Sequence, residues 1–182
     1  MRRKNTTSEM MKGYMADALL ILMREKDYAD IAIGEITSKA GVNRSTFYRN
    51  FSSKDEIIKH YFNQIIHTHR ASLSEKQTSI ESYLLDMFTH YYGYKNELLL
   101  IHRAKVSYIM LETFNETFSV IRADTTLESK YATHYHTGGI YSTFLLWFEN
   151  CMTETPVEMT RTAMSYYPAN LRPYLWMEQG KG

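Results

Sequence analysis

Apolar residues recur along most of this chain at intervals of three and four, which places them on one face of an α-helix. Met11, Met15, Ala18 and Leu22 form the first such stripe. We find no convincing alternation of apolar and polar residues, so the pattern predicts an all-α protein. The expected helices span residues 7–26, 33–40, 44–51, 54–72, 79–94, 96–103, 105–122, 127–152 and 156–167.

Several of these helix starts are marked by a Ser or Thr followed three residues later by Glu. At this spacing the hydroxyl accepts a hydrogen bond from the third helical N–H, and the carboxylate reaches back to the N–H of the cap. Pro156 adds a second start signal, because its missing N–H has no partner to lose at the first helical position. The five pairs are Thr6–Glu9, Ser53–Glu56, Thr78–Glu81, Thr125–Glu128 and Thr155–Glu158.

The stretch ITSKAGVNRSTFYRNFSSKDEII predicts two short helices joined by a tight turn. Gly41 can adopt the left-handed conformation that such a turn requires. Asn43 is a good N-cap for the second of these helices. Phe47 and Phe51 are four residues apart and are expected to face the core together.

The opposite face of this second short helix carries guanidiniums, hydroxyls and one aromatic ring, with no carboxylate. Arginine is the usual bidentate partner of guanine, and the major groove of DNA admits an α-helix. The pattern therefore predicts a DNA-reading helix-turn-helix. Three alternatives stay open: Tyr48 is mainly a packing residue, Arg49 is only a solvated charge, or the helix pair docks on a protein.

Composition adds a modest charge asymmetry to this picture. Residues 1–54 contain 10 Lys and Arg against 6 Asp and Glu, whereas the remaining residues contain 11 against 14. A basic N-terminal third is typical of a module that binds a polyanion. The single cysteine, Cys151, fits a reducing cytoplasm, and the apolar runs are shorter than the roughly 20 residues that a membrane span needs.

The stretch YADIAIGEITSKAGVNRSTFYRNFSSKDEII (Tyr28 to Ile58) resembles the DNA-binding region of TetR/AcrR-family transcriptional regulators. Ala-Gly-Val at 40–42, Thr-Phe-Tyr at 46–48, Phe51 and Ser53-Lys54 carry the resemblance, which covers roughly the first 60 residues. In that family the third helix reads the groove, and the lysine at the start of the fourth helix contacts phosphate. The implied DNA-binding residues are Asn43, Arg44, Ser45, Thr46, Tyr48, Arg49, Asn50 and Lys54.

The same resemblance implies a domain plan and a mode of action. A three-helix DNA-binding head at residues 1–53 is joined by a long fourth helix to an effector-binding and dimerisation domain at 54–182. The partners expected are a near-palindromic double-stranded operator, a second copy of the chain, and either a small-molecule effector or a partner protein. Ala32 and Gly34 depart from the family pattern in the second helix, and the arm of Arg2, Arg3 and Lys4 is expected to compensate.

Large aromatic residues are concentrated in the second part of the chain, where 20 of the 25 Phe, Tyr and Trp follow Lys54. Such side chains are core residues first, but buried tyrosines need hydrogen-bond partners and also suit a cavity of mixed polarity. The two interpretations remain open. The residues expected in an effector pocket are Tyr91, Tyr92, His102, Met110, Phe114, Phe118, Tyr135 and Tyr141, with Tyr108 as a further possibility.

The stretch YHTGGIYSTFLLWFENCMTETPVEMTRTAM (Tyr135 to Met164) resembles the C-terminal region of the subgroup that includes the dihydroxyacetone-kinase operon activator. Gly-Gly-Ile, the downstream Trp147 and the Thr-Pro-x-Glu-Met start of the last helix carry this resemblance. It implies that the last two long helices form a dimer interface; the alternative is that these residues belong to an intramolecular core. The implied interface residues are Ile140, Phe144, Trp147, Phe148, Val157 and Met164.

Other chemistry is sparse in the sequence. His67 and His69 are two apart, as are His134 and His136, and this spacing points the two side chains of a pair to different sides of a helix. We therefore expect no metal site, no cofactor and no catalytic residue. An all-α enzyme with a DNA-binding head is the alternative, and it would need convergent titratable groups in the second part of the chain.

Overall fold

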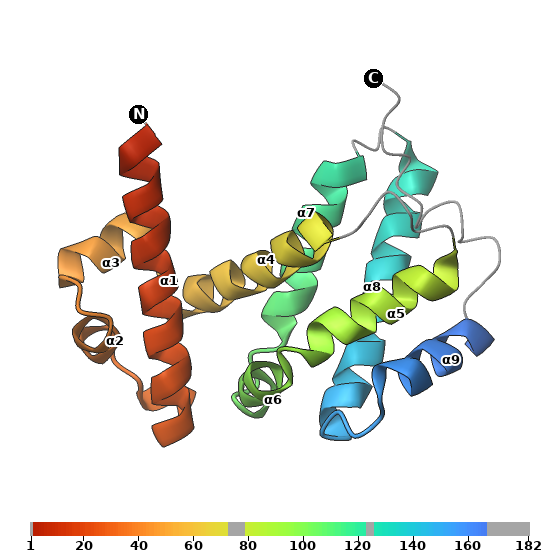
Figure 1. The fold of residues 1–182 in the computed structure, drawn as a ribbon. Helices are drawn as coiled ribbons and strands as arrows, with labels where there is room; N and C mark the ends of the chain where they lie inside the picture. The colour runs from red at the N-terminus through yellow and green to blue at the C-terminus, as the bar shows by residue number, and fades with distance from the viewer. Residues whose placement is uncertain (1, 73–78, 123–125, 167–182) are drawn as a thin grey trace. The chain divides into compact units, whose positions relative to one another are not determined.

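The structure is a computed structural model that describes residues 2–72, 79–122 and 126–166. These residues form nine α-helices and one short 3-10 helix and contain no strand, which confirms the all-α prediction. None of the helices in these ranges is long and apolar enough to cross a membrane. The elements (Figure 1) are α1 (Arg2–Glu25), η1 (Tyr28–Asp30), α2 (Ile33–Lys39), α3 (Arg44–Asn50), α4 (Lys54–Ser72), α5 (Ile80–Tyr92), α6 (Lys95–Arg103), α7 (Tyr108–Arg122), α8 (Leu127–Glu149) and α9 (Pro156–Tyr166).

Backbone contacts divide the chain into two compact units. The first unit comprises Met1–Ile66 and Asn96–Met110, and the second comprises His67–Lys95 and Leu111–Gly182. The helix α4 thus contributes residues 54–66 to the first unit and 67–72 to the second. The division at residue 54 expected from the sequence concerns function and stays a prediction.

In the first unit, α2 and α3 pack beside α1 (Figure 1). The core contains Met15, Leu19, Ile36 and Phe47, each with no exposed surface. Burying side chains of this size stabilises the fold by roughly 1.5–3 kcal/mol each, so α1, α2 and α3 are held together mainly by this shared core. The consequence is a small scaffold with a fixed outer surface.

The turn between α2 and α3 has the geometry expected from its glycine. Gly41 has φ +66°, in the left-handed region. The Val42 N–H donates to the Thr37 carbonyl at 2.9 Å and the Gly41 N–H to the Ser38 carbonyl at 3.2 Å, which together make a Schellman motif. The motif satisfies the last carbonyls of α2 and turns the chain sharply into α3.

The second unit is built around aromatic rings from α5 and α8. Phe88 lies 5.9 Å from Phe144 and 5.5 Å from Trp147 between ring centroids, and Tyr91 lies 4.8 Å from Phe144. The helix α9 packs on α5. The helix α8 continues without a break through Gly138 and Gly139.

The helix starts follow the predicted boxes in part. At α9 the Thr155 Oγ1 accepts from the Glu158 N–H at 3.3 Å and the Glu158 carboxylate accepts from the Thr155 N–H at 2.8 Å, as expected. At α4 the Glu56 carboxylate reaches the Ser52 N–H instead of the Ser53 N–H. For α5 the N-cap is Ser79, whose hydroxyl accepts from the Ser82 N–H. The boxes at Thr6, Thr78 and Thr125 involve side chains outside the described part of the chain.

Candidate nucleic-acid interface

The orientation of α3 is fixed by its inward side. Phe47 is fully buried and Phe51 is 5% exposed, and their ring centroids lie 6.1 Å apart. Asn43 is the N-cap residue, and its carbonyl accepts from the Thr46 N–H at 2.8 Å, although its side chain makes no capping hydrogen bond. With both phenylalanines inside, the opposite side of this two-turn helix must face outward.

Arg44 and Tyr48 act as one unit on that outward side. Tyr48 is 55% exposed, and its ring packs edge-on against Phe47 at 5.2 Å. The Arg44 guanidinium lies 5.7 Å from the Tyr48 ring centroid and donates to the Tyr48 hydroxyl at 3.2 Å. The phenol therefore presents its polar end at the surface and preorganises the neighbouring guanidinium.

A second arginine lies one turn further along the same surface. Arg49 donates to the Thr46 hydroxyl at 3.1 Å, and both Arg49 and Ser45 are exposed. No carboxylate occurs anywhere in α3. The side presented by α3 therefore offers two guanidiniums and three kinds of hydroxyl group, a donor-rich surface suited to phosphates and base edges.

Asn50, also expected to contact DNA, is used inside the protein. Its side-chain oxygen accepts from the Ser8 hydroxyl at 2.6 Å, and its amide N–H donates to the Thr46 carbonyl at 2.7 Å. These bonds tie the end of α3 to α1. We interpret Asn50 as a residue that positions the helix, because its amide oxygen and one of its two N–H groups already bind within the protein.

Lys54, expected on a phosphate, is engaged in the same way. Its ammonium donates to the carbonyls of Tyr28, Ala29 and Ile31 at 2.7, 3.2 and 2.8 Å, and lies 4.7 Å from the Tyr28 ring centroid. All three N–H groups of the ammonium are thereby used. A direct hydrogen bond from Lys54 to phosphate would require one of these bonds to break.

Beside this lysine, one carboxylate joins two tyrosines distant in the sequence. Asp55 accepts from the Tyr28 hydroxyl and from the Tyr108 hydroxyl, each at 2.6 Å. Burial, together with this hydrogen bond and the charge of Asp55, raises the pKa of Tyr28 above its usual value. The partners are separated by 27 and 53 residues, so no local sequence signal predicts this network.

The two positions that depart from the family pattern, Ala32 and Gly34, offer no polar side chain to a ligand. Gly34 is exposed, and a Cβ added there would meet nothing within 4 Å. Glu35 accepts from the Ala32 N–H at 2.9 Å and from Lys26 at 2.6 Å, and these bonds lower the pKa of its carboxyl. The side chains of the N-terminal arm at residues 2–4 lie outside the described part of the chain.

Three of the residues expected in an effector pocket are fully or almost fully buried. Tyr91 and Phe114 are both 3% exposed and belong to the aromatic core of the second unit. Met110 has no exposed surface and belongs to the first unit. These side chains fill space in the described structure, as the core interpretation had it.

The other expected pocket residues are placed differently from one another. Tyr92 stacks on Trp147 with ring centroids 5.9 Å apart. His102 lies in the first unit, 3.3 Å from the Ser107 hydroxyl, and Tyr108 is the Asp55 partner. Tyr135 is 71% exposed and lines a cavity. The remaining two are Phe118, half-buried beside Phe114, and Tyr141, whose pKa is raised by burial.

The six residues expected at a dimer interface lie in different environments. Phe144, Trp147 and Phe148 are 0–2% exposed and pack within the second unit, which agrees with the intramolecular alternative. Val157 is 55% exposed. Ile140 is 8% exposed and lines the same cavity as Tyr135, and Met164 is half-buried. For the exposed member, contact with a second copy stays a prediction.

Comparison with known proteins identifies the N-terminal segment. Residues 16–61, from the middle of α1 into α4, match the model of a family described as bacterial regulatory proteins, tetR family. The chain is also 34% identical over 58 residues to the uncharacterized HTH-type transcriptional regulator YxbF of Bacillus subtilis (strain 168). That alignment covers 32% of this chain and 14% of the relative.

The family model is one of tetR-type bacterial regulatory proteins, and the relative is named an HTH-type transcriptional regulator. The family model covers α2, α3 and their turn, the part of the first unit in which the geometry above was found. The chain spans about one seventh of the length of the relative that it matches. The subgroup expected from the C-terminal stretch is not among these findings.

Proposed function

We propose that this chain is a TetR-type transcriptional regulator that acts in the cytoplasm by binding a double-stranded DNA operator through α3. One observation carries the proposal. Buried Phe47 holds α3 so that Arg44, Ser45, Tyr48 and Arg49 lie together on an exposed surface without a carboxylate. Arginine side chains on such a helix can make bidentate contacts with guanine in the major groove. No catalytic role is proposed.

We propose further that the regulator is a homodimer. One chain supplies one recognition helix, whereas a two-fold dimer supplies two, which would read half-sites about 34–36 Å apart or a multiple of that distance. Exposed apolar residues on the last two helices, among them Leu146 (59%) and Val157 (55%), support a contact surface there. The operator should therefore be a near-palindrome.

The second unit is proposed to bind a small-molecule effector. A ligand that prefers one arrangement of the dimer would shift its population and so change operator affinity. The helix α4 contributes residues to both units and is the proposed connection. The alternative is control by a partner protein, to which the C-terminal subgroup resemblance gives support. An open cavity in the second unit favours a small ligand over that alternative.

The test is selection of binding sites from random double-stranded DNA, followed by gel-shift measurements at two salt concentrations. The selected sequence should be a near-palindrome, and its binding should survive added salt better than non-specific binding does. Arg44→Ala should weaken binding to the selected site by about 5- to 150-fold, equivalent to roughly 1–3 kcal/mol for a base contact. Tyr48→Ala should weaken it as well.

The matched control is Arg70→Ala, which removes an exposed arginine from α4 and leaves α3 intact. It should bind the selected site like the wild type. Circular dichroism should show that all three variants remain folded. If Arg44→Ala and Tyr48→Ala both bind with unchanged affinity, α3 is not the reading helix and the proposal is wrong.

A further inference from the structure

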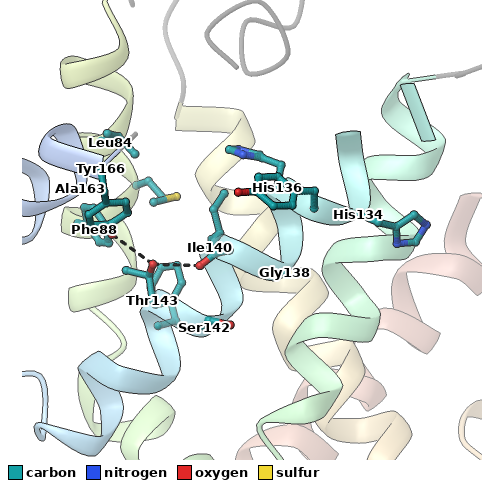
Figure 2. Close-up of a pocket in the computed structure, with 14 residues that line it drawn as sticks. Leu84, Phe88, His134, His136, Gly138, Ile140, Ser142, Thr143, Ala163 and Tyr166 are labelled. Atoms are coloured by element: carbon teal, nitrogen blue, oxygen red, sulfur yellow. Dashed lines mark hydrogen bonds between the residues drawn. The ribbon is translucent and has the colours of Figure 1, made fainter. Parts of the chain in front are cut away.

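The second unit contains a cavity of about 480 Å³ among α5, α8 and α9 (Figure 2). Its apolar wall includes Leu84 and Phe88 from α5, Phe144 from α8 and Ala163 from α9. Small-molecule sites typically measure about 300–1,000 Å³, so the volume suits a compact organic molecule. All residues that line it belong to one unit.

Two adjacent glycines lie in the middle of α8, with open space beside them in the described part of the chain. A Cβ at Gly138 or Gly139 would meet nothing within 4 Å, and both residues line the cavity. Glycine inside a helix lowers its stability, because the unfolded chain loses more conformational freedom on folding. No packing contact in the described structure requires glycine here. Their effect is to leave the cavity wider than any other residue would.

The polar groups of the cavity favour a hydrogen-bond donor. The Thr143 hydroxyl donates to the Gly139 carbonyl at 3.0 Å and lies 3.2 Å from the Tyr166 hydroxyl (Figure 2). Threonine has a single hydroxyl proton, and with that proton on the Gly139 carbonyl the second bond takes its proton from Tyr166. The Tyr166 oxygen then keeps lone pairs with which it can accept a proton from a ligand.

The lining also excludes a strongly charged occupant. Among the described residues the lining contains no Asp, Glu, Lys or Arg, and its histidines come from α8, where His134 extends away from Phe88 and Thr143 (Figure 2). A charged molecule would lose its hydration here without gaining an opposite charge. The rings of Tyr135 and Tyr166, which are 71% and 53% exposed, offer instead a surface on which flat apolar groups can stack.

We infer that this cavity binds a neutral, mostly apolar aromatic molecule that carries a hydroxyl or N–H donor. The ligand packs against Tyr135 and Tyr166, occupies the space beside Gly138, and donates to the Tyr166 oxygen. The regulatory meaning of the site rests on the proposed function, in which this ligand is the effector. The site is distinct from the set of tyrosines that the sequence indicated, because of these only Tyr135 lines the cavity.

The experiment titrates the full chain with N-phenyl-1-naphthylamine, a neutral fluorescent probe with two aromatic groups and one N–H donor. The wild type should show a saturable rise in fluorescence with one site per chain. Gly138→Leu places a side chain in the cavity while keeping a good helix-forming residue, and should weaken binding at least tenfold. The matched control, Gly13→Leu, fills open space beside a helical glycine of α1 and should bind like the wild type.

A second variant tests the hydrogen bond without altering the volume. Tyr166→Phe removes the acceptor from a side chain that is 53% exposed, so the fold should not change. It should weaken binding of the probe by about threefold to tenfold. The anionic probe 1-anilinonaphthalene-8-sulfonate should bind the wild type more weakly than the neutral one, because no Lys or Arg in the described ranges lines the cavity.

Three results would overturn the inference. They are the absence of saturable binding, equal binding by Gly138→Leu and the wild type, and loss of probe binding as the chain dimerises in sedimentation experiments. The last would mean that a second copy closes the cavity. Operator binding by the same preparations separates the two proposals. A wild type that binds operator but no probe disproves the ligand site alone, and one that binds probe but no operator disproves only the DNA-binding proposal.

Discussion

The two units use aromatic side chains in different ways. In the first unit Phe47 points into the core and its neighbour Tyr48 points outward, so successive residues of one short helix have opposite roles. In the second unit Phe88, Phe144 and Trp147 cluster on one another inside longer helices. In a two-turn helix on a small core, each residue has one possible environment. In a long helix with several neighbouring helices, each residue has many possible environments.

Polar contacts differ between the units as well. In the first unit, the exposed side of α3 is supported by three residues whose hydrogen-bond partners lie far away in the sequence. These residues are Lys54, Asp55 and Asn50. The second unit also has such contacts, from Lys95 to the Met152 carbonyl and from Thr137 to Asn115, but its polar groups Thr143 and Tyr166 lie at a cavity. The comparison suggests that the first unit is built to be rigid, and that the second is built to accept another molecule.

The largest expected effect tests whether the first unit depends on one buried ring. Phe47→Ala should destabilise that unit by about 3–5 kcal/mol, because a fully buried aromatic is replaced by a cavity. Tyr48→Ala, at the adjacent exposed position, should change stability by no more than about 0.5 kcal/mol. Hydrogen exchange measured by mass spectrometry should show faster exchange in peptides from α1–α3 for Phe47→Ala. Similar behaviour of the two variants would contradict the packing described here.

The next effect concerns pH and the second unit. His69 is 6% exposed and its Nε2 has no hydrogen-bond partner among the described residues; burial, and then the nearby His90, lower its pKa to about 4. The unfolded chain therefore takes up the proton first as the pH falls. The contribution of His69 to the free energy of unfolding is fully present above about pH 6.5 and is lost toward pH 4. At pH 4.5 the loss is about 2–3 kcal/mol.

Urea denaturation at pH 7.5 and 4.5 measures this loss. His69→Gln should remove it, since glutamine does not titrate, while His67→Gln on the exposed side of α4 should retain it. Peptides from the second unit should account for the difference in hydrogen exchange. An unchanged pH dependence in His69→Gln would show that the acid sensitivity arises elsewhere.

A third prediction separates two roles for Lys54. Lys54→Met should destabilise the first unit by about 1.5–3 kcal/mol, the usual value of hydrogen bonds to a charged group. Lys39→Met removes only an exposed ion pair with Glu25 and should cost about 1 kcal/mol or less. Thermal denaturation gives both values. If Lys54 only positions η1, the salt dependence of operator binding by Lys54→Met stays that of the wild type; a decrease in slope of about 1 would indicate a phosphate contact.

The smallest effect compares one glycine from each unit. Gly13→Ala and Gly138→Ala should each stabilise the chain by about 0.5–1 kcal/mol, since neither new methyl group meets another atom within 4 Å. Thermal denaturation without ligand tests this equality. If Gly138→Ala alone destabilises the chain, the space beside α8 is already occupied in solution.

Local features of the first unit could be read from the sequence. The bounds of α2 and α3, the left-handed Gly41 and the inward Phe47 all follow from contacts within a few residues. By contrast, Asn50 and Lys54 carry out tasks set by Ser8 in α1 and by the carbonyls of η1. Those partners become visible only when distant segments are placed together, and η1 itself has no sequence signature.

In the second unit the helices were predictable and the roles of their side chains were not. The long α8 was expected from its periodicity, but the pattern could not tell whether Phe144 faces a second copy, a ligand or its own core. Residues expected at a dimer interface or in a pocket are distributed among core, cavity and surface, as Trp147, Ile140 and Val157 illustrate. Apolar periodicity indicates which residues are buried, but it does not indicate whether a second copy, a ligand or the chain's own core covers them.

The three carbonyls around Lys54 have a consequence for sequence variation in proteins built this way. They converge on one nitrogen from different directions, with Tyr28 and Ile31 contributing the two short contacts of 2.7 and 2.8 Å. A tetrahedral ammonium can satisfy such a cup, whereas a flat guanidinium spreads its donors in one plane. Arginine carries the same charge but should therefore be a poor substitute at this position, because its planar donors do not match the arrangement of the three carbonyls.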